Sequence, residues 1–274
     1  MPNNPVRVIV HAGFHKTGTT SLQDFLSSKQ DALQDHYRFY GKLDFRKAGA
    51  HARIYGQRPF PWRLWRFRRS FRGFLNSIED FHTIILSRET FSGGMPGHRR
   101  LSRRMVKTYQ SAARPLATVI LAELRKRFGA GTDITFVYTV RDTDDWRKSV
   151  HGHLLRSIRL RDDLEAFSAR FPDQQGPEYE ARKMALFLDP VPVITIRLED
   201  FQDDKEGPAA AILDMLDVPD SKRQILVKAF RSNPGQSADM RRKMLDLNRS
   251  PLGRKKLKSA KDKLLRADAT AKTK

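Results

Sequence analysis

The sequence predicts an α/β fold in three layers, with a central parallel sheet flanked by helices. Four short apolar runs separated by helical segments indicate the strands, at residues 6–10, 82–87, 134–140 and 193–198. The runs are apolar at consecutive positions, which is typical of strands buried on both faces of a parallel sheet. Functional groups in such sheets gather where the strands end, so the residues after each run are the first candidates for a site.

Capping residues and helical spacing mark the segments between the strands. One helix follows the first run directly, and another is expected at residues 115–128, because Pro115 suits a first turn and Gly129 follows the end. The remaining expected helices span residues 143–158, with Asp142 or Thr143 as the cap, and residues 178–188, 209–216 and 222–230.

The segment from residue 30 to residue 80 is irregular and rich in arginine and aromatic residues. Within it, residues 58–78 have the pattern of an amphipathic helix, with apolar residues at Leu64, Phe67, Phe71, Phe74 and Ile78. One interpretation is that this helix packs its apolar stripe on the core. The alternative is a membrane-surface or acceptor-gating helix, and Trp62 and Trp65 at the start of the helix support that alternative. We expect the whole segment to shape the pocket for an acceptor.

The length of 274 residues suits one large domain, which we place at residues 1–250, followed by a basic tail at residues 251–274. No apolar run approaches the roughly 20 residues of a membrane span, and the N-terminus lacks the pattern of a secretory signal. The absence of cysteine excludes disulfides and thiolate metal sites. These features favour a cytoplasmic protein.

The net charge of +21 is unevenly distributed, since residues 222–274 hold 17 Lys and Arg against 4 Asp and Glu. Such a basic segment is a solvated face, or it binds an anionic membrane surface, an acidic polymer or nucleic acid. No zinc-finger spacing and no aromatic ribonucleoprotein motif is present in the sequence, which argues against nucleic acid. Contact with the inner face of a membrane would be peripheral.

The first strand opens into a glycine-containing loop with the sequence GFHKTGTT. Gly13 and Gly18 let the backbone turn tightly, and the amides around Gly18, Thr19 and Thr20 can converge on an anion at a helix N-terminus. In loops that bind nucleoside triphosphates the lysine directly follows the second glycine. Here Thr19 occupies that place and Lys16 lies earlier in the loop. We therefore expect the loop to hold a phosphate, but not a β- or γ-phosphate with magnesium.

Polar clusters also follow the second and third strands, at Arg88-Glu89 and from Arg141 to Ser149. Because the carboxyl ends of parallel strands share one edge of the sheet, these clusters and the glycine loop are expected to line one cleft. Arg141 offers a planar guanidinium fork, and Ser149 offers a hydroxyl inside the next helix. Together they suit a second phosphate.

These two motifs resemble those of one enzyme family, the PAPS-dependent sulfotransferases. The stretch HAGFHKTGTTSLQ is similar to the family's 5′-phosphosulfate loop, including that of bacterial members with the sequence HKTGTTSLQ. Arg141 and Ser149 match the family's 3′-phosphate motif, although Thr143 stands where a proline is often found. The resemblance covers residues 6–200. It implies a P-loop-like fold that binds 3′-phosphoadenosine 5′-phosphosulfate (PAPS) and releases the bisphosphate PAP.

The resemblance also implies roles for individual residues. Lys16 would bind the oxygen that bridges the 5′-phosphate and the sulfuryl group, where negative charge grows as that bond breaks, so no metal is needed. Arg141 and Ser149 would bind the 3′-phosphate, and Arg241, beyond a loop at residues 232–237, is a further candidate. The residues expected to hold the 5′-phosphosulfate are His15, Lys16, Thr17, Gly18, Thr19 and Thr20.

Transfer to an acceptor hydroxyl requires a general base. Glu89, just past the second strand, is the first candidate, since several glycan and protein sulfotransferases similarly carry a glutamate base there. A structural ion pair of Glu89 with Arg88 or another neighbour is the alternative. His51 competes for the role of base, or it is a surface or packing residue. His151 and His153 point to different faces of a helix, so they do not indicate a metal site.

The sequence thus favours a sulfotransferase, with a carbohydrate or glycolipid as the expected acceptor. The main alternative is a P-loop kinase of a small molecule, against which stand the missing lysine after Gly18 and the lack of a clear aspartate at a strand end to hold magnesium. Another alternative is a basic adaptor that binds anionic membranes or polymers without catalysis. It leaves the glycine loop without a purpose. The acidic pair Glu199-Asp200 after the fourth strand is expected to cap a turn or fix an arginine.

Overall fold

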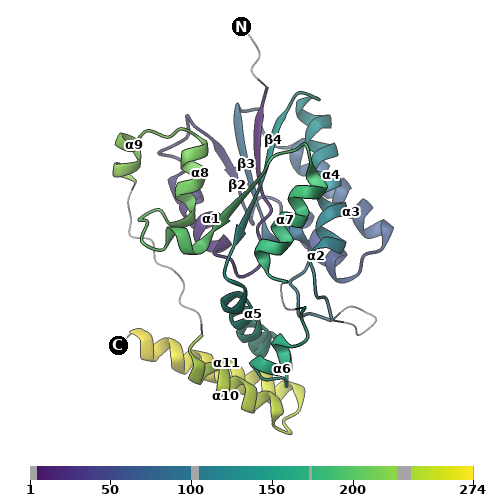
Figure 1. Ribbon diagram of the computed structural model, residues 1–274, viewed down its shortest axis with the longest axis vertical. Coiled ribbons are helices and arrows are strands. Elements are labelled where there is room, and N and C mark those ends of the chain that lie inside the picture. The colour runs from purple at the N-terminus through teal and green to yellow at the C-terminus, as the bar shows by residue number, and fades with distance from the viewer. Residues whose placement is uncertain (1–4, 100–104, 173–174, 227–235, 274) are drawn as a thin grey trace. The chain divides into compact units, whose positions relative to one another are not determined.

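The structure is a computed structural model that describes residues 5–99, 105–172, 175–226 and 236–273. The chain divides into two compact units (Figure 1). Unit 1 comprises Met1–Trp146 and Gln174–Asn233, and unit 2 comprises Arg147–Asp173 and Pro234–Lys274. The boundary between them falls within helix α5 (Thr143–Ser157).

Unit 1 is built on a five-stranded sheet in which all neighbouring strands run parallel. The strand order is β2-β3-β1-β4-β5. The strands are β1 (Arg7–His11), β2 (Arg38–Tyr40), β3 (Thr83–Ser87), β4 (Asp133–Val140) and β5 (Val193–Arg197). Each of the four apolar runs forms a strand at its expected place. The predicted α/β fold is confirmed, and its parallel sheet flanked by helices is consistent with a three-layer P-loop-like fold.

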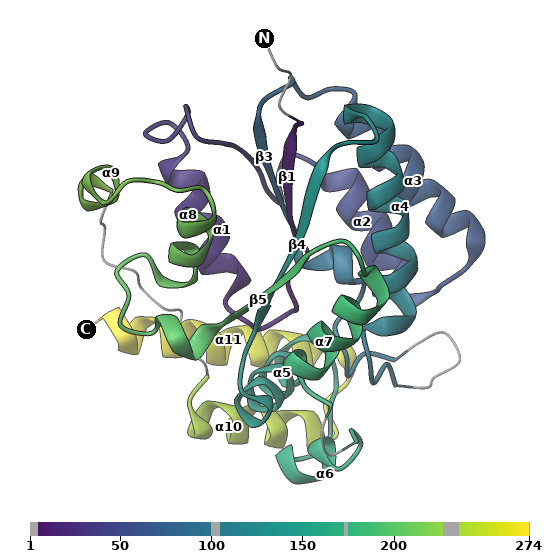
Figure 2. The same cartoon turned by 45° about the horizontal axis from the view of Figure 1, so that its top comes forward.

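Helices cover both faces of this sheet (Figure 2). The helices on one face are α1 (Thr19–Lys29), α8 (Ala210–Met215) and α9 (Asp220–Ile225). Those on the other face are α2 (Arg46–Gln57), α3 (Pro61–Leu75), α4 (Gln110–Phe128) and α7 (Pro177–Leu188). In the described part of the chain, three short 3₁₀ turns follow strand ends or precede helices. They are η1 (Glu89–Ser92), η2 (Leu198–Phe201) and η3 (Gly207–Ala209).

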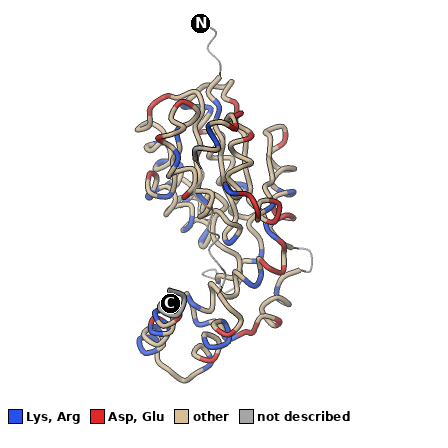
Figure 3. The backbone as a smooth tube through the Cα atoms, turned by 90° about the vertical axis from the view of Figure 1, so that its left-hand side faces the viewer, with Lys and Arg blue, Asp and Glu red and all other residues tan. Residues whose placement is uncertain are grey.

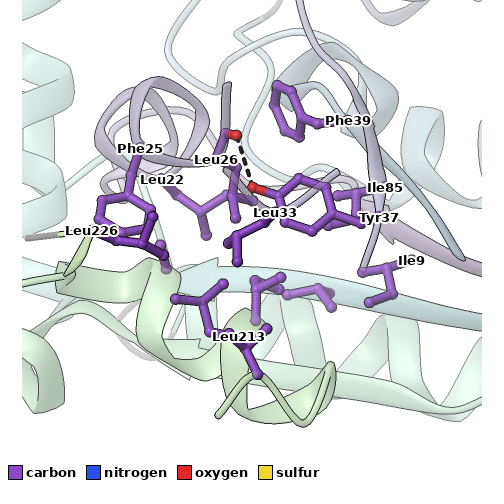
Figure 4. Close-up of a cluster of buried hydrophobic side chains, with 14 of the residues drawn as sticks. Ile9, Leu22, Phe25, Leu26, Leu33, Tyr37, Phe39, Ile85, Leu213 and Leu226 are labelled. Carbon is purple, nitrogen blue, oxygen red and sulfur yellow. Dashed lines mark hydrogen bonds between the residues drawn. The ribbon is translucent and has the colours of Figure 1, made fainter. Parts of the chain in front are cut away.

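The buried core of unit 1 explains why the strands are apolar at consecutive positions. Ile9 and Ile85 pack against Leu22 and Leu26 of α1 and against Leu213 of α8 (Figure 4). Neighbouring strand residues, which point to the opposite face, are buried as well. The central strands are therefore covered on both sides. The edge strand β5 differs, because Ile194 is exposed there, so the expectation that every strand is buried on both faces is wrong for β5.

The segment from residue 30 to residue 80 is more regular than its sequence indicated, since it contains β2 and the unexpected helix α2. Two glycines lower the helical propensity of α2, yet the packing requires them. A Cβ at Gly49 would overlap the side chain of Arg88, and a Cβ at Gly56 would overlap the backbone of Gly94. The helix expected at residues 58–78 forms as α3.

Helix α4 is longer than its sequence indicated, because it begins at Gln110 rather than at residue 115. Pro115 therefore lies inside the helix, where its missing N–H removes one backbone hydrogen bond without ending the helix. The expected helix at residues 222–230 forms as α9, and its second half lies outside the described residues.

Helix α3 packs its apolar stripe inward and is joined to α4 by a buried carboxylate. Glu123 of α4 is 1% exposed and pairs with Arg68 and Arg72 of α3, each at 2.6 Å. The hydrogen bond from Arg72, opposed by burial and assisted by Arg68, lowers the pKa of Glu123 to about 2. The interpretation of α3 as a core-packing helix is therefore supported for its inner face.

Replacing Glu123 by glutamine is expected to destabilise unit 1 by about 2–3 kcal/mol at neutral pH, since two arginines lose their buried partner. A depressed carboxyl pKa stabilises the fold above the ordinary pKa of 4.5, and this contribution disappears as the pH falls toward about 2. Denaturant unfolding at pH 7 and pH 3 measures both effects. The difference in the free energy of unfolding between wild type and Glu123→Gln should be smaller at pH 3 than at pH 7. The control Glu79→Gln changes an exposed carboxylate and should have little effect on the free energy of unfolding at either pH.

Unit 2 comprises the later part of α5 together with α6 (Leu164–Ser168), α10 (Ala238–Arg249) and α11 (Arg254–Thr273). Leu155, Met240 and Met244 form its apolar cluster, with Leu264 and Leu265 packed against them. The ammonium of Lys261 is buried against the end of α5 and donates to the carbonyls of Leu155 at 2.6 Å and Ile158 at 2.8 Å.

The basic C-terminal segment is thus largely helical, and many of the Lys and Arg residues of unit 2 belong to α10 and α11 (Figure 3). The domain boundary at residues 250 and 251 stays a prediction. Within the part of the chain that the structure describes, no helix is both long enough and apolar enough to cross a membrane.

Candidate functional site

The candidate site lies in unit 1, at the carboxyl ends of β3, β1 and β4. Strand β1 pairs with β3 on one side and with β4 on the other, and His11 at its end is in register with Ser87 and Val137. From β1 the chain crosses first to β2 and β3 and later to β4 and β5, so the direction of crossing reverses beside β1. Ligands of open parallel sheets bind at such reversal points.

Two residues of the glycine loop adopt left-handed backbone. Gly18, with φ of 81°, is the N-cap of α1, and Lys16, with φ of 73°, is a rare non-glycine residue in this region. The N-cap Gly18 has no side chain that could cap α1, so no N-cap side chain occupies the first-turn N–H groups of this helix. A Cβ at Gly18 would lie 2.7 Å from Leu198, which brings the end of β5 against the loop.

The threonine hydroxyls of the loop hold its shape. Thr17 and Thr19 both donate to the carbonyl of Phe14, at 2.7 and 3.1 Å, and Thr17 also contacts the hydroxyl of Thr139 on β4 at 2.8 Å. Thr20, by contrast, is exposed. In this structure the hydroxyls of Thr17 and Thr19 therefore point into the protein, and they fix the path of the loop backbone.

A buried polar cluster beneath the loop joins three strand ends. The imidazole of His11 lies 2.6 Å from the hydroxyl of Ser87 and 3.3 Å from that of Thr139. Gln23 of α1 donates to Ser87 as well. Burial lowers the pKa of His11 to about 4, against a weaker opposing effect of Glu89, so His11 is neutral at physiological pH. The cluster anchors the start of the loop and the first turns of α1.

His15 is held by two aromatic side chains that the sequence did not single out. Its backbone N–H donates to the hydroxyl of Tyr109 at 3.1 Å, and its carbonyl accepts from the indole of Trp146 at 3.0 Å. The imidazole stacks on the ring of Tyr109. Burial lowers the pKa of His15 to about 4. His15 is therefore a neutral, positioned residue next to Lys16.

Glu89 begins the turn η1, and two contacts fix this turn against the end of β1 and the residue that precedes the glycine loop. The N–H of Arg88 donates to the carbonyl of His11 at 3.0 Å, and the hydroxyl of Ser92 donates to that of Ala12 at 2.8 Å. Burial alone would raise the pKa of Glu89, but His15, Arg88, Lys42 and a backbone hydrogen bond outweigh it, and the pKa is lowered. Glu89 is thus an ionised, mostly buried carboxylate.

The guanidinium of Arg88 donates its hydrogen bonds to groups other than Glu89. Its Nε donates to Thr90 at 2.9 Å and its Nη1 to the carbonyl of Lys42 at 2.6 Å. Within the described residues no ion pair joins Arg88 to Glu89. The structural alternative of an Arg88 pair is therefore not formed, and the carboxylate of Glu89 is not held by that neighbour.

Arg141 directly follows β4, as the sequence indicated, and Asp142 caps α5 by accepting the N–H groups of Asp144 and Asp145. Glu199, after β5, accepts the N–H of Asp142 at 2.9 Å, so it fixes this turn rather than an arginine. Arg141 lies 3.8 Å from Asp145, and its Nε is buried without a hydrogen-bond partner in the described part of the chain.

Ser149 and Arg241 belong to unit 2. Ser149 lies in α5 on the same face as Gly152, and a Cβ at Gly152 would lie 3.5 Å from the side chain of Arg241. Arg241 therefore packs against α5 at Gly152, about one turn beyond Ser149. The expected pairing of Ser149 with Arg141 stays a prediction. Residues 232–235 of the late basic loop lie outside the described residues.

His51 lies in α2 and faces α3. Its Nδ1 is 3.1 Å from the carbonyl of Arg66 and 3.0 Å from the hydroxyl of Ser70, which are the contacts of a packing residue. Another residue of α2, Arg53, acts electrostatically on His15 and Arg88. Arg53 gave no recognisable pattern in the sequence, since arginine is common throughout this segment.

His151 is buried and contacts the carbonyl of Asp162 at 2.9 Å, whereas His153 lies 3.4 Å from Arg156. Among the described residues no three histidine or carboxylate side chains come together as a metal site requires.

Comparisons with other proteins give no further indication of what the site does. No model of a known protein family matches the chain, and no curated protein sequence matches it. Any functional assignment therefore depends on the residues of the site.

Proposed function

We propose that this protein is a sulfotransferase that transfers a sulfuryl group from PAPS to an acceptor hydroxyl and releases PAP. The observation that carries the proposal is the loop after β1, in which Lys16 precedes Gly18 and both adopt left-handed backbone. A lysine ahead of the second glycine differs from the nucleoside triphosphate pattern, where it follows that glycine.

The residues present fit the phosphates of such a donor. The first-turn amides of α1, which no N-cap side chain occupies, suit the 5′-phosphate, together with the exposed hydroxyl of Thr20. The buried Nε of Arg141 has no partner in the described part of the chain, and a 3′-phosphate would satisfy it. Thr17 and Thr19 would support the loop through Phe14 and Thr139 rather than bind phosphate through their hydroxyls.

The donor, when bound, supplies a sulfuryl group whose bond to the 5′-phosphate oxygen breaks as the acceptor oxygen bonds to sulfur. The ammonium of Lys16 would neutralise the negative charge that grows on the leaving oxygen. Glu89, ionised because its pKa is lowered, would take the proton of the acceptor hydroxyl. Because Lys16 and the loop amides supply the positive charge that magnesium supplies in kinases, we propose that no metal takes part.

The acceptor side of the site would be formed by α2 and η1, which lie in contact on one face of the sheet. We propose a carbohydrate or a glycolipid as the acceptor, and a cytoplasmic location for the enzyme. The positive side chain of Arg53 on α2, which acts on His15 and Arg88, favours an acceptor with negative charge.

Calorimetric titration with PAP, ADP and ATP, each with and without magnesium, tests the proposal. Tight binding of PAP without magnesium, and much weaker binding of ADP, would support it, because only PAP carries the 3′-phosphate. Preference for ATP with magnesium would contradict it in favour of a kinase. Binding of none of the three would contradict it in favour of a non-enzymatic basic protein.

Replacing Arg141 by alanine is expected to weaken PAP binding by about 10- to 100-fold, since a charge-assisted contact to phosphate is lost. The turnover at saturating PAPS should stay within about threefold of wild type. Arg125→Ala, which removes an exposed arginine of α4, is the matched control and should change neither quantity. A turnover defect with unchanged PAP binding would contradict the role of Arg141.

A further inference from the structure

We propose that the outer face of α3 binds the surface of a membrane that contains anionic phospholipids. This basic-aromatic face is defined by Trp62, Trp65, Arg66 and Arg69, with Phe60 just before the helix. The four helical residues follow one another at spacings of three, one and three, so they share one side of the helix. The inference is independent of the proposed sulfotransferase activity.

The aromatic side chains of this face are unusually exposed. Trp62 is 53% and Trp65 is 56% exposed, and Phe60 is 36% exposed. Phe60 and Trp62 stack on each other, with ring centroids 4.5 Å apart and planes 5° apart. They therefore form one apolar surface rather than scattered single residues. Tryptophan is enriched at the head-group level of bilayers, where its ring meets apolar chains and its N–H meets water.

The arginines of the same face carry charge that no carboxylate of the described residues neutralises through an ion pair. Arg68 and Arg72 pair with Glu123, but within the described residues no carboxylate lies within 4 Å of Arg66 or Arg69. Both are exposed. Helix α3 contains no acidic residue at all. This face is thus complementary in charge to the phosphates of anionic lipids.

The opposite face of α3 fixes the helix in the fold. Phe67, Phe71 and Leu75 are buried, and the bridges to Glu123 hold α3 on α4. The exposed side chains are therefore presented on a rigid helix, which reduces the entropy lost on binding. At 15 residues the helix is about 22 Å long, so it can lie in the plane of a membrane surface.

The ring geometry favours a membrane over single-stranded nucleic acid, which the same residue types could also bind. Bases stack on open aromatic faces. Here Phe60 and Trp62 cover one another, and the guanidinium of Arg69 lies over the ring of Trp65, 5.6 Å from its centroid. These contacts occupy one face of each ring, while the side chains of Trp62 and Trp65 stay more than half exposed and can insert among lipid head groups without stacking.

Flotation with lipid vesicles tests the proposal on the full-length protein. Binding is expected to vesicles of phosphatidylcholine with about 30% phosphatidylserine and not to phosphatidylcholine alone, and it should weaken at high salt. Arg66→Gln with Arg69→Gln should weaken binding by about 10- to 30-fold. Lys255→Gln with Lys258→Gln, which removes two exposed charges from α11, is the matched control and should cause less than about a threefold loss.

Brominated lipids provide a second readout, since bromine quenches only tryptophans that reach the bilayer. The chain has 3 tryptophans, and Trp146 is buried. Wild type should be quenched, and Trp62→Phe with Trp65→Phe, which leaves only Trp146, should not be.

Three results would overturn the proposal. The first is that the double lysine variant of α11 loses as much vesicle binding as the double arginine variant of α3. The second is that the tryptophans of vesicle-bound wild type are not quenched. The third is that the protein binds single-stranded oligonucleotides but not vesicles. Because PAP binding is not measured in these experiments, their failure is distinguishable from failure of the proposed enzymatic function.

Discussion

Replacing Lys16 by alanine is expected to lower the turnover of sulfuryl transfer by about 10²- to 10³-fold while PAP binding changes by less than about threefold. The reason is that negative charge on the leaving oxygen is larger in the transition state than in the bound donor. An ammonium placed at that oxygen therefore acts mainly on the chemical step. Single-turnover rates and calorimetric titration with PAP separate the two quantities. Lys126→Ala, which removes an exposed lysine of α4, is the control.

The left-handed backbone of Lys16 adds a second expectation, for stability. A non-glycine residue at φ of 73° lowers the stability of the fold by about 1–2 kcal/mol, and glycine, which lacks a Cβ, avoids this strain. Lys16→Gly should therefore unfold at a higher temperature than Lys16→Ala while being equally inactive. A more stable but equally inactive Lys16→Gly would indicate that the protein tolerates backbone strain at this position because the lysine side chain is needed for the reaction. If Lys16→Gly kept the wild-type turnover, or if both variants failed to bind PAP, the assigned role would be wrong.

The central fold is predictable because its strands depend on local composition. The runs that became β1, β3 and β4 are nearly continuous apolar stretches, and burial on both faces of a parallel sheet requires such stretches. Strand β2 has only three residues. Helix α2 contains two glycines, and a side chain at either position would overlap Arg88 or Gly94. Both elements depend on tertiary contacts, which a sequence pattern does not contain.

The candidate site is predictable to the extent that it follows strand ends. The parallel order of β3, β1 and β4 brings the glycine loop, Glu89 and Arg141 to one edge of the sheet, as expected from their positions after apolar runs. The supporting residues were not predictable. Tyr109 and Trp146 contact the backbone of His15 from distant parts of the chain, and they carry no motif. Likewise, no spacing indicates that the hydroxyls of Thr17 and Thr19 turn inward.

Replacing Glu89 by glutamine is expected to lower the turnover by about 10²- to 10⁴-fold. Glutamine has nearly the same shape as glutamate, but its amide cannot take the proton from the hydroxyl of the sulfuryl acceptor. PAP binding should be unchanged. The lowered pKa of Glu89 also predicts how the turnover depends on pH. A base with a depressed pKa stays ionised as the pH falls, so the turnover should not decline through loss of this base until the pH is below the ordinary carboxyl pKa of 4.5.

His51→Gln is the matched comparison, since it tests the competing base on a residue whose ring contacts Arg66 and Ser70 of α3. If Glu89 is the base, His51→Gln should keep the turnover within about threefold of wild type, apart from any loss of stability that thermal unfolding would reveal. A larger turnover loss in His51→Gln than in Glu89→Gln, with both proteins folded and both binding PAP, would transfer the role to His51. Equal activity of Glu89→Gln and wild type would leave Glu89 as a structural carboxylate, kept ionised by a backbone hydrogen bond and by the charges of Arg88 and Lys42, without a part in proton transfer.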